Sequence, residues 1–387
     1  MSDDIKFFDS FDDMELKEVL LRGIYGYGFE KPSDIQSKCI VPIISGRDVI
    51  GQAKSGTGKT GAFGIAMLNL IDIEKKILQG MILVHTHELA IQIYNVLKEL
   101  GTYMKGLNIN LSIGGGNIKD NIENIKNSHI TIGTVGRLYD LIVRRKVIDL
   151  DDMKILVVDE ADAVLVNKQT NLEQVKTIIS NIPKKSQICI FSATLPKEVI
   201  SLTKHFMNNP VCVLMEDKEL SLDGIKQYYI DIEKETYKLD TLKDIYKKIM
   251  VSQCIIYVNT KEKGEFLYKT LTEENNMISL IHGNMDSENR AKIMNDFRIG
   301  KNRILLSTDL LARGIDVQQV NLIINYDLPF NNECYLHRIG RSGRFGRRGM
   351  VINFITNDDK INFKNIIKTY NINMIELQDE NLEELNA

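Results

Sequence analysis

Residues Ala53–Thr60, AKSGTGKT, indicate the fold class, because their spaced glycines and closing Lys-Thr pair form a phosphate-binding pattern. It follows the short apolar run Asp48–Gly51 and precedes a helix-like segment over Gly61–Ile71. Strand, glycine-rich loop and helix in this order direct backbone N–H groups and a helix N-terminus at an anion. The pattern normally opens with glycine, and Ala53 stands there instead. The alternative interpretation is an ordinary glycine-rich turn, so partner motifs further along the chain decide between the two.

A phosphate loop of this kind would bind a nucleoside triphosphate together with Mg²⁺. Lys59 would reach the β- and γ-phosphates, and Thr60 would present its hydroxyl to the metal ion. The residues expected to surround the nucleotide here are Ser55, Gly56, Thr57, Gly58, Lys59 and Thr60.

Composition excludes several classes of protein. The chain has 387 residues, 43% of them hydrophobic and 26% charged, which favours a globular protein of two domains. A net charge of -3 gives no overall basic signature, so any contact with nucleic acid requires a local cleft. The five cysteines lie far apart and lack metal-ligand spacing, which predicts reduced, buried thiols. The acidic start MSDDIKFFDS and the absence of any apolar run near about 18 residues predict an intracellular protein that does not span a membrane.

Apolar strand-like runs alternate with helix-length segments, which predicts parallel βα units in an open α/β sheet. After a helix-like segment at Asp13–Gly23, the runs in the first half are Met81–Val84, Ile130–Gly133, Ile155–Val158 and Ile188–Phe191. Those in the second half are Tyr228–Ile232, Cys254–Val258, Ser279–Ile281, Ile304–Leu306, Leu322–Asn325 and Val351–Ile355. We therefore predict two α/β domains, residues 1–215 and 225–387, joined by a polar linker over residues 216–224. In each, the loops after the carboxyl ends of the strands should carry the site.

The second chemical motif is Asp159-Glu160-Ala161-Asp162, which directly follows the apolar run Ile155–Val158. A buried strand that delivers carboxylates at its carboxyl end would place Asp159 beside Mg²⁺ and let Glu160 polarise the attacking water. The alternative is a solvated acidic turn that caps the next helix. The phosphate loop upstream favours the catalytic interpretation.

The second half of the chain contains HRIGRSGRFGR, His337–Arg347. Arginines three residues apart would lie on one helical face, and a forked guanidinium suits developing phosphate charge. The alternative is a solvated basic helix. A site that draws its phosphate loop from one half and its arginines from the other would be complete only when the halves close.

From about Phe7 to Asn373 the chain resembles the DEAD-box RNA helicases, most of all the eukaryotic initiation factor 4A branch, because many motifs recur in the same order. The segment from Phe11 through LLRGIYGYGFEKPSDIQ is similar to the family's Q motif. The resemblance implies that Gln36 reads the adenine edge, Phe29 stacks on the base and Phe11 supports the loop. Ser33 is a further nucleotide contact by the same resemblance.

The other nucleotide motifs are also similar in order. AKSGTGKT resembles motif I, Asp159–Asp162 motif II, and Ser192-Ala193-Thr194 motif III, which couples nucleotide state to the grip on RNA. Ser307–Asp316 resembles motif V, with Gly314 and Asp316 at the ribose, and HRIGRSGRFGR resembles motif VI, with Arg341 and Arg344 as arginine fingers. The coupling residues implied are Asp162, Ser192, Thr194 and His337.

The RNA-facing motifs match less well. Where the family has PTRELA, this chain has HTHELA, so His85 replaces a proline and His87 replaces a phosphate-contacting arginine. The alternative is a neutral change at the end of a loop. The family's TPGR is Thr134-Val135-Gly136-Arg137, and its QxxR is Ser287-Glu288-Asn289-Arg290. By resemblance, the expected RNA contacts are Thr86, His87, Gly114, Gly115, Thr134, Gly136, Arg137, Asn259, Thr260, Gly283, Arg290 and Thr308.

The resemblance implies two tandem RecA-like domains, each a mostly parallel sheet flanked by helices. It implies an ATP-dependent RNA helicase that uses ATP and Mg²⁺, grips the RNA backbone with little sequence preference, and separates short duplexes locally. The expected pathway is translation initiation or another part of RNA metabolism. We expect a cytoplasmic monomer, stimulated by a partner like initiation factor 4G; the nucleus is the alternative location, or the host cytoplasm if the source is viral.

Three other functions are alternatives to an RNA helicase. An ATP-gated RNA clamp that scaffolds partners would show little turnover. A binding module that keeps the fold without catalysis is disfavoured by the presence of Glu160, Arg341 and Arg344. A translocating DNA helicase is disfavoured by Gln36, since that segment resembles the DEAD-box pattern.

Overall fold

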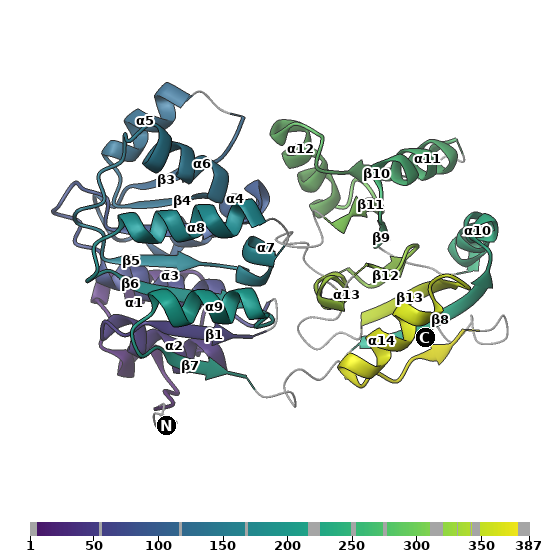
Figure 1. Ribbon diagram of the computed structural model, residues 1–387, viewed down its shortest axis with the longest axis horizontal. Helices are drawn as coiled ribbons and strands as arrows, with labels where there is room; N and C mark the ends of the chain where they lie inside the picture. Colours follow the sequence, from purple (N-terminus) through teal and green to yellow (C-terminus); the bar gives the residue numbers. More distant parts are fainter. Residues whose placement is uncertain are drawn as a thin grey trace. The chain divides into compact units, whose positions relative to one another are not determined.

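The computed structural model describes residues 6–53, 56–115, 118–166, 169–215, 225–248, 253–273, 277–309, 320–330, 332–340, 342 and 349–377. The chain divides into two compact units, Met1–Leu220 and Ser221–Ala387. Each contains a seven-stranded sheet in which the paired strands run parallel (Figure 1). The predicted fold class, two α/β domains with mostly parallel sheets flanked by helices, is confirmed. The predicted linker, residues 216–224, lies outside the described residues, and the predicted boundaries stay predictions.

The first unit's sheet has the strand order β3-β4-β2-β5-β6-β1-β7. Its strands are β1 (Val49–Gln52), β2 (Gly80–Val84), β3 (Ile109–Ser112), β4 (Ile130–Thr134), β5 (Ile155–Val158), β6 (Gln187–Ser192) and β7 (Val211–Leu214). Strands β2, β5 and β6 are buried along their whole length, as expected where helices cover both faces of a parallel sheet.

Helices cover both faces of this sheet, with α2 and α3 on one side and α8 and α9 on the other (Figure 1). The helical elements are η1 (Phe11–Met14), α1 (Glu18–Gly26), α2 (Asp34–Ile44), α3 (Lys59–Leu70), α4 (His87–Leu100), α5 (Ile118–Lys126), α6 (Val135–Tyr139), the π-helix η2 (Asp140–Arg144), α7 (Ala161–Val166), α8 (Gln169–Asn181) and α9 (Lys197–Phe206). Alternate side chains of β5 enter opposite cores: Val157 packs in the core under α2 and α3, and Val158 packs in the core under α8 and α9.

The second unit repeats this plan with the order β10-β11-β9-β12-β13-β8-β14. Its strands are β8 (Ile225–Glu233), β9 (Cys254–Val258), β10 (Ile278–Ile281), β11 (Ile304–Thr308), β12 (Leu322–Asn325), β13 (Gly349–Thr356) and β14 (Ile375–Glu376). Its helical elements are η3 (Glu235–Tyr237), α10 (Lys238–Lys248), α11 (Lys261–Thr272), α12 (Ser287–Arg298), α13 (Asn332–Ile339) and α14 (Lys360–Tyr370). Among the described helices, none has the length and apolar character needed to cross a bilayer.

The prediction of a helix over Asp13–Gly23 is wrong about where the helix begins. Phe11–Met14 is a short 3-10 turn, and α1 begins only at Glu18. The chain cannot continue as one helix because Glu15 has a left-handed backbone, with φ of 55°, and Lys17 is extended, with ψ of 135°. Apolar spacing alone did not reveal this break.

Candidate functional site

The phosphate loop lies between β1 and α3, as predicted. Gly56 and Gly58 have φ of 84° and 102°, a conformation that favours glycine. Helix α3 starts at Lys59, two residues earlier than expected, so Lys59 and Thr60 form its first turn. The buried ammonium group of Lys59 donates a 2.7 Å hydrogen bond to the carbonyl of Ala53. Ser55 lies outside the described residues.

Gln36 joins the predicted adenine-reading segment to this loop. It lies in the first turn of α2 and is 2% exposed. Its Oε1 accepts from the backbone N–H of Ser33 at 2.9 Å, and its Nε2 donates to the carbonyl of Gly58 at 3.3 Å. An amide has two donor hydrogens and two acceptor lone pairs, so these two bonds use one site of each kind and leave one of each. Gln36 thus has the chemical capacity that the predicted adenine contact requires.

Sequence reasoning missed Gly61 as a residue of this site. A Cβ atom at Gly61 would lie 2.4 Å from Nε2 of Gln36 and 3.1 Å from the ring of Phe29. Glycine is therefore required for the close approach of α3 to the predicted base-binding side chains. The sequence carried no signal for this contact beyond the position of Gly61 directly after the loop.

The predicted base-stacking residue Phe29 belongs to an aromatic cluster. Its ring is stacked on Phe11, with centroids 6.4 Å apart and planes inclined by 22°, and it meets Tyr27 edge-on at 4.8 Å. Phe11 is fully buried, and the ring of Tyr25 meets it edge-on with centroids 6.4 Å apart. Phe11 therefore contacts the predicted stacking residue and does not itself reach solvent, in keeping with its predicted supporting role.

Asp159 follows β5 at its carboxyl end and is 3% exposed. Burial raises the pKa of this carboxyl to about 7, although the positive charge of Lys59 opposes the rise. The neighbouring carboxylates Glu160 and Asp162 raise it further. A buried carboxylate beside two others in this way is stabilised when a cation binds to it.

Glu160 lies next to Asp159 in a left-handed backbone conformation, with φ of 48°. Its Oε2 lies 3.4 Å from Nδ1 of His85, and both side chains are nearly buried, at 6% and 10% exposure. His85 follows β2, the strand that pairs with β5. The structure therefore brings a residue from the altered RNA-facing motif into contact with the predicted general base.

The predicted coupling residues after β5 and β6 also meet. The hydroxyl of Ser192 accepts from the backbone N–H of Asp162 at 3.1 Å, and the hydroxyl of Thr194 donates to Asp162 Oδ2 at 3.0 Å. Asp162 is 2% exposed. The two hydroxyls thus bind the backbone N–H and the buried carboxylate of Asp162, while their coupling role stays a prediction.

Three neighbouring strands of the first unit bring the predicted RNA contacts to one edge of the sheet. Thr86 caps α4 after β2 by accepting from the N–H of Leu89, and Thr134 ends β4. The N–H of Gly114, after β3, donates to Nε2 of His87 at 3.2 Å. Gly115 follows with φ of 94°, while Gly136 and Arg137 lie in the first turns of α6.

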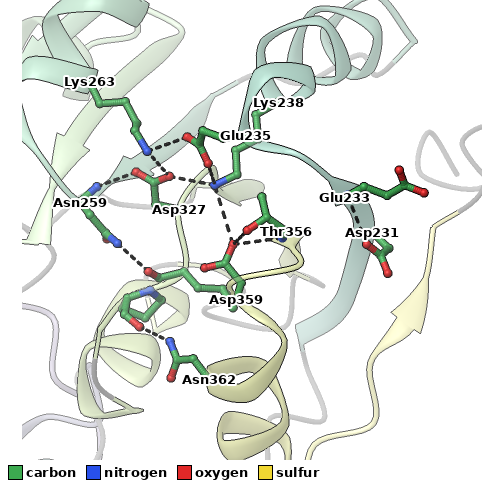
Figure 2. A network of polar contacts seen from close by, with 12 residues as sticks. Asp231, Glu233, Glu235, Lys238, Asn259, Lys263, Asp327, Thr356, Asp359 and Asn362 are labelled. Carbon is green, nitrogen blue, oxygen red and sulfur yellow. Dashed lines mark hydrogen bonds and ion pairs between the residues drawn. The ribbon is translucent and has the colours of Figure 1, made fainter.

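In the second unit, Asn259 belongs to a polar network around Asp327 (Figure 2). Its backbone N–H donates to Asp327 Oδ2 at 3.0 Å, and its side-chain amide donates to the carbonyl of Leu328 at 2.8 Å. Lys238, 2% exposed, and Lys263 bind Asp327 Oδ1 at 2.9 Å and 2.8 Å. Burial favours the protonated carboxyl, but these two cations outweigh it, so the pKa of Asp327 is lowered.

The predicted helical face of arginines in HRIGRSGRFGR stays a prediction, because Arg341, Arg344 and Arg347 lie outside the described residues. Helix α13 ends at Ile339, and Ser342 pairs with Val320 in a β-bridge. Arg338 is fully buried and donates to Asp309 Oδ1 at 2.5 Å and to Asn259 Oδ1 at 2.8 Å. Arg338 thus ties the residue that follows β9 to the residue that follows β11, a structural role that spacing did not predict.

The other predicted residues of the second unit are partly described. Gly283 follows β10, Thr308 ends β11, and Thr260 caps α11 by accepting from the N–H of Lys263. Arg290, on α12, and His337, on α13, are buried. The predicted residues Gly314, Asp316, Arg341 and Arg344 lie outside the described residues.

Comparisons with known proteins agree with this geometry. Residues 33–202 match the DEAD/DEAH box helicase family, and residues 237–346 match the helicase conserved C-terminal domain. The chain is 49% identical over 369 residues to the ATP-dependent RNA helicase eIF4A of Debaryomyces hansenii, covering 95% of this chain and 92% of that protein. It is 48% identical over 382 residues to the ATP-dependent RNA helicase FAL1 of Kluyveromyces lactis, covering 98% and 95%. S. cerevisiae Dbp5 bound to RNA and ADP BeF3 has a TM-score of 0.89 at 34% identity, covering 98% of both chains.

Proposed function

Because the chain belongs to the DEAD-box family of ATP-dependent RNA helicases, we propose that its catalytic centre consists of the residues gathered around the phosphate loop. The carrying observation is the convergence of separate segments on that loop: Gln36 binds Gly58, and the charge of Lys59 acts on Asp159. In this proposal Gln36 and Phe29 hold the adenine. Lys59 binds the terminal phosphates, and Glu160 polarises the attacking water.

Mg²⁺ fits the donor set at this centre. The raised pKa of Asp159 shows that burial destabilises its ionised carboxylate, and a bound cation would relieve this. Thr60 offers a hydroxyl in the first turn of α3. Mg²⁺ is commonly held by one or two such groups together with substrate phosphates and water. When bound, it would neutralise charge on the terminal phosphates, and Asp159 and Thr60 would orient it.

We propose that RNA lies along the carboxyl ends of β2, β3 and β4 in the first unit. The N–H of Gly114 donates to Nε2 of His87 there, which joins the loop after β3 to the first turn of α4 at this edge. Contacts of this kind bind sugar and phosphate and read little sequence. In the second unit the corresponding edge, with Thr260, Gly283 and Thr308, is proposed to bind RNA in the same way.

The names of the relatives support a more specific role. Two kinds of relative are similar over nearly the whole chain, and one kind is called initiation factor 4A. We propose that this protein acts as a cytoplasmic monomer in translation initiation. We further propose that a helicase-stimulating protein like initiation factor 4G raises its turnover.

Strand displacement tests the proposed activity. A short labelled RNA duplex should be separated when ATP and Mg²⁺ are both present, and Asp159→Asn should abolish the separation. A matched duplex several times longer should resist, because local opening of a few base pairs releases only short strands. Separation of neither duplex, with RNA retained tightly in the presence of ATP, would instead support an ATP-gated clamp.

A further inference from the structure

The pairing of β2 with β5 places His85 opposite Glu160. Leu83 and Val158 are register partners in the parallel ladder, and the N–H of Asp159 donates to the carbonyl of Leu83 at 3.0 Å. His85 and Glu160 each come two residues after that pair. The two strands therefore deliver the imidazole and the carboxylate to the same level of the sheet edge, where Nδ1 and Oε2 lie 3.4 Å apart.

The contact matters because Glu160 is an almost buried carboxylate among other negative groups. Its side chain is 6% exposed and interacts electrostatically with the carboxyl of Asp159. Asp159 in turn interacts with Asp162. An ionised carboxylate in such a place is costly unless donors stabilise it. A neutral imidazole can supply one donor from Nδ1 without carrying a charge.

The backbone of Glu160 adds a second reason to expect restraint. Its φ of 48° is in the left-handed region, which non-glycine residues adopt only when their surroundings hold them there. The N–H of Glu160 is bound to Asp159 Oδ1 at 2.9 Å. With the backbone held, the direction of the carboxylate depends on its side-chain torsions, and a neighbouring imidazole restricts these.

We propose that His85 is a positioning residue for Glu160: the Nδ1 side of its imidazole, 3.4 Å from Oε2, orients the carboxylate toward the attacking water. The inference rests on the proposed role of Glu160 as the group that polarises water. Proline, which stands here in the PTRELA pattern, has no side-chain donor. The orienting contact is therefore a feature of this chain's HTHELA sequence, and it opposes the reading of His85 as a neutral change.

Two variants at this position separate the donor from the mere presence of a side chain. His85→Leu removes the donor and keeps a buried apolar side chain, while the amide of His85→Asn places a donor close to the position of Nδ1. At saturating RNA, His85→Leu should lower kcat by about tenfold, the scale of one hydrogen bond to a charged group, with KM for ATP unchanged. His85→Asn should recover most of kcat. An unchanged or raised kcat in His85→Leu, or equal losses in both variants, would overturn the proposal.

A double-mutant cycle with Glu160→Gln tests whether the effect passes through Glu160. In the Glu160→Gln background, His85→Leu should cause no further loss of turnover, whereas an independent, multiplicative loss would overturn the proposal. His205→Leu, at an exposed position on α9, is the control variant, since it should leave kcat and KM for ATP unchanged. The proposed function is tested separately. It is upheld if RNA stimulates ATP hydrolysis by the unmodified protein and Glu160→Gln abolishes this hydrolysis, whatever the His85 variants do.

Discussion

The backbone N–H of Gly114 donates a 3.2 Å hydrogen bond to Nε2 of His87, which joins the loop after β3 to the first turn of α4. A ring nitrogen that accepts a hydrogen bond carries no proton, so the imidazole in this arrangement is neutral. His87 therefore provides shape and a hydrogen bond at the proposed RNA-binding edge without adding a positive charge there. A Cβ atom at Gly114 would lie 3.3 Å from the ring, so glycine suits this contact.

His87→Arg should add one cationic contact to RNA. Each phosphate neutralised on a single strand contributes about 0.7 to the slope of log K against log salt, so the slope should steepen by that amount. RNA binding measured by fluorescence anisotropy at several salt concentrations, with a non-hydrolysable ATP analogue, checks this. Because arginine cannot accept from Gly114, the variant should also lose about 1 kcal/mol of stability. Equal salt slopes in the two proteins would show that residue 87 does not face the phosphates.

Gln36 should determine the preference for ATP over GTP, because an amide that donates and accepts matches the adenine edge and mismatches guanine. Gln36→Ala should erode this preference in competition for hydrolysis. Gln36→Glu is the matched control, since its side chain can still accept from Ser33 but cannot donate. It should keep the N-terminal cap of α2 and lose the selectivity. Unaltered selectivity in both variants would refute the role of Gln36.

Glu160→Gln should slow hydrolysis by roughly 10²–10⁴-fold, the range typical of a general base. The amide nearly preserves the size of the side chain, so ATP and RNA binding should be retained. Single-turnover hydrolysis and equilibrium binding, measured on the same preparation, separate the two effects. Normal hydrolysis by the variant would mean that another group activates the water.

Asp159 should make the first unit less stable as pH rises. Its pKa is raised by burial from 3.8 to about 7, so the folded state binds a proton more tightly than the unfolded state. The stability linked to this proton is full below the lower value and is lost as pH rises through the higher one. The test uses nucleotide-free protein without Mg²⁺ and compares the thermal stability of Asp159→Asn with that of the unmodified chain. This difference should shift in favour of the variant between pH 5 and pH 8. A stability difference that does not change with pH would contradict the shift.

Asp327 should anchor the second unit through its buried ion pairs. Asp327→Asn removes the carboxylate that faces Lys238 and Lys263 and should cost about 3 kcal/mol, as expected when one partner of a buried pair is lost. Lys247→Met is the control, because its pair with Asp244 is exposed at 74% and 67% and should matter little. Thermal unfolding followed by circular dichroism compares the two. Equal, small effects of the two substitutions would show that the ion pairs of Asp327 do not stabilise the second unit.

The strands were predictable where burial on both faces makes a continuous apolar run. Cys254–Val258 and Leu322–Asn325 agree with β9 and β12 at both ends. The apolar pattern did not predict strand β3, because its buried positions include the polar residues Asn110 and Ser112, which hydrogen-bond to each other at 2.8 Å. Buried polar pairs interrupt the apolar pattern on which such predictions depend. The two-residue strand β14 is too short to carry a pattern.

Local sequence predicts candidate site residues within each motif, but it does not predict the contacts between motifs. The bond from Gln36 to Gly58 and the contact of His85 with Glu160 depend on how α2 meets α3 and on the register of β2 with β5. Arg338 illustrates the same limit, since its burial follows from where α13 packs. Spacing along the chain cannot supply these relationships.

RNA-stimulated ATP hydrolysis is the decisive measurement for the proposed activity. The steady-state rate should be measured with Mg²⁺ in the absence of nucleic acid, with single-stranded RNA and with DNA of the same sequence, for the unmodified chain and for Glu160→Gln. The proposed activity predicts a low basal rate, marked stimulation by RNA, little stimulation by DNA, and no stimulated turnover in the variant. Equal stimulation by RNA and DNA, or RNA-stimulated turnover that survives Glu160→Gln, would contradict it.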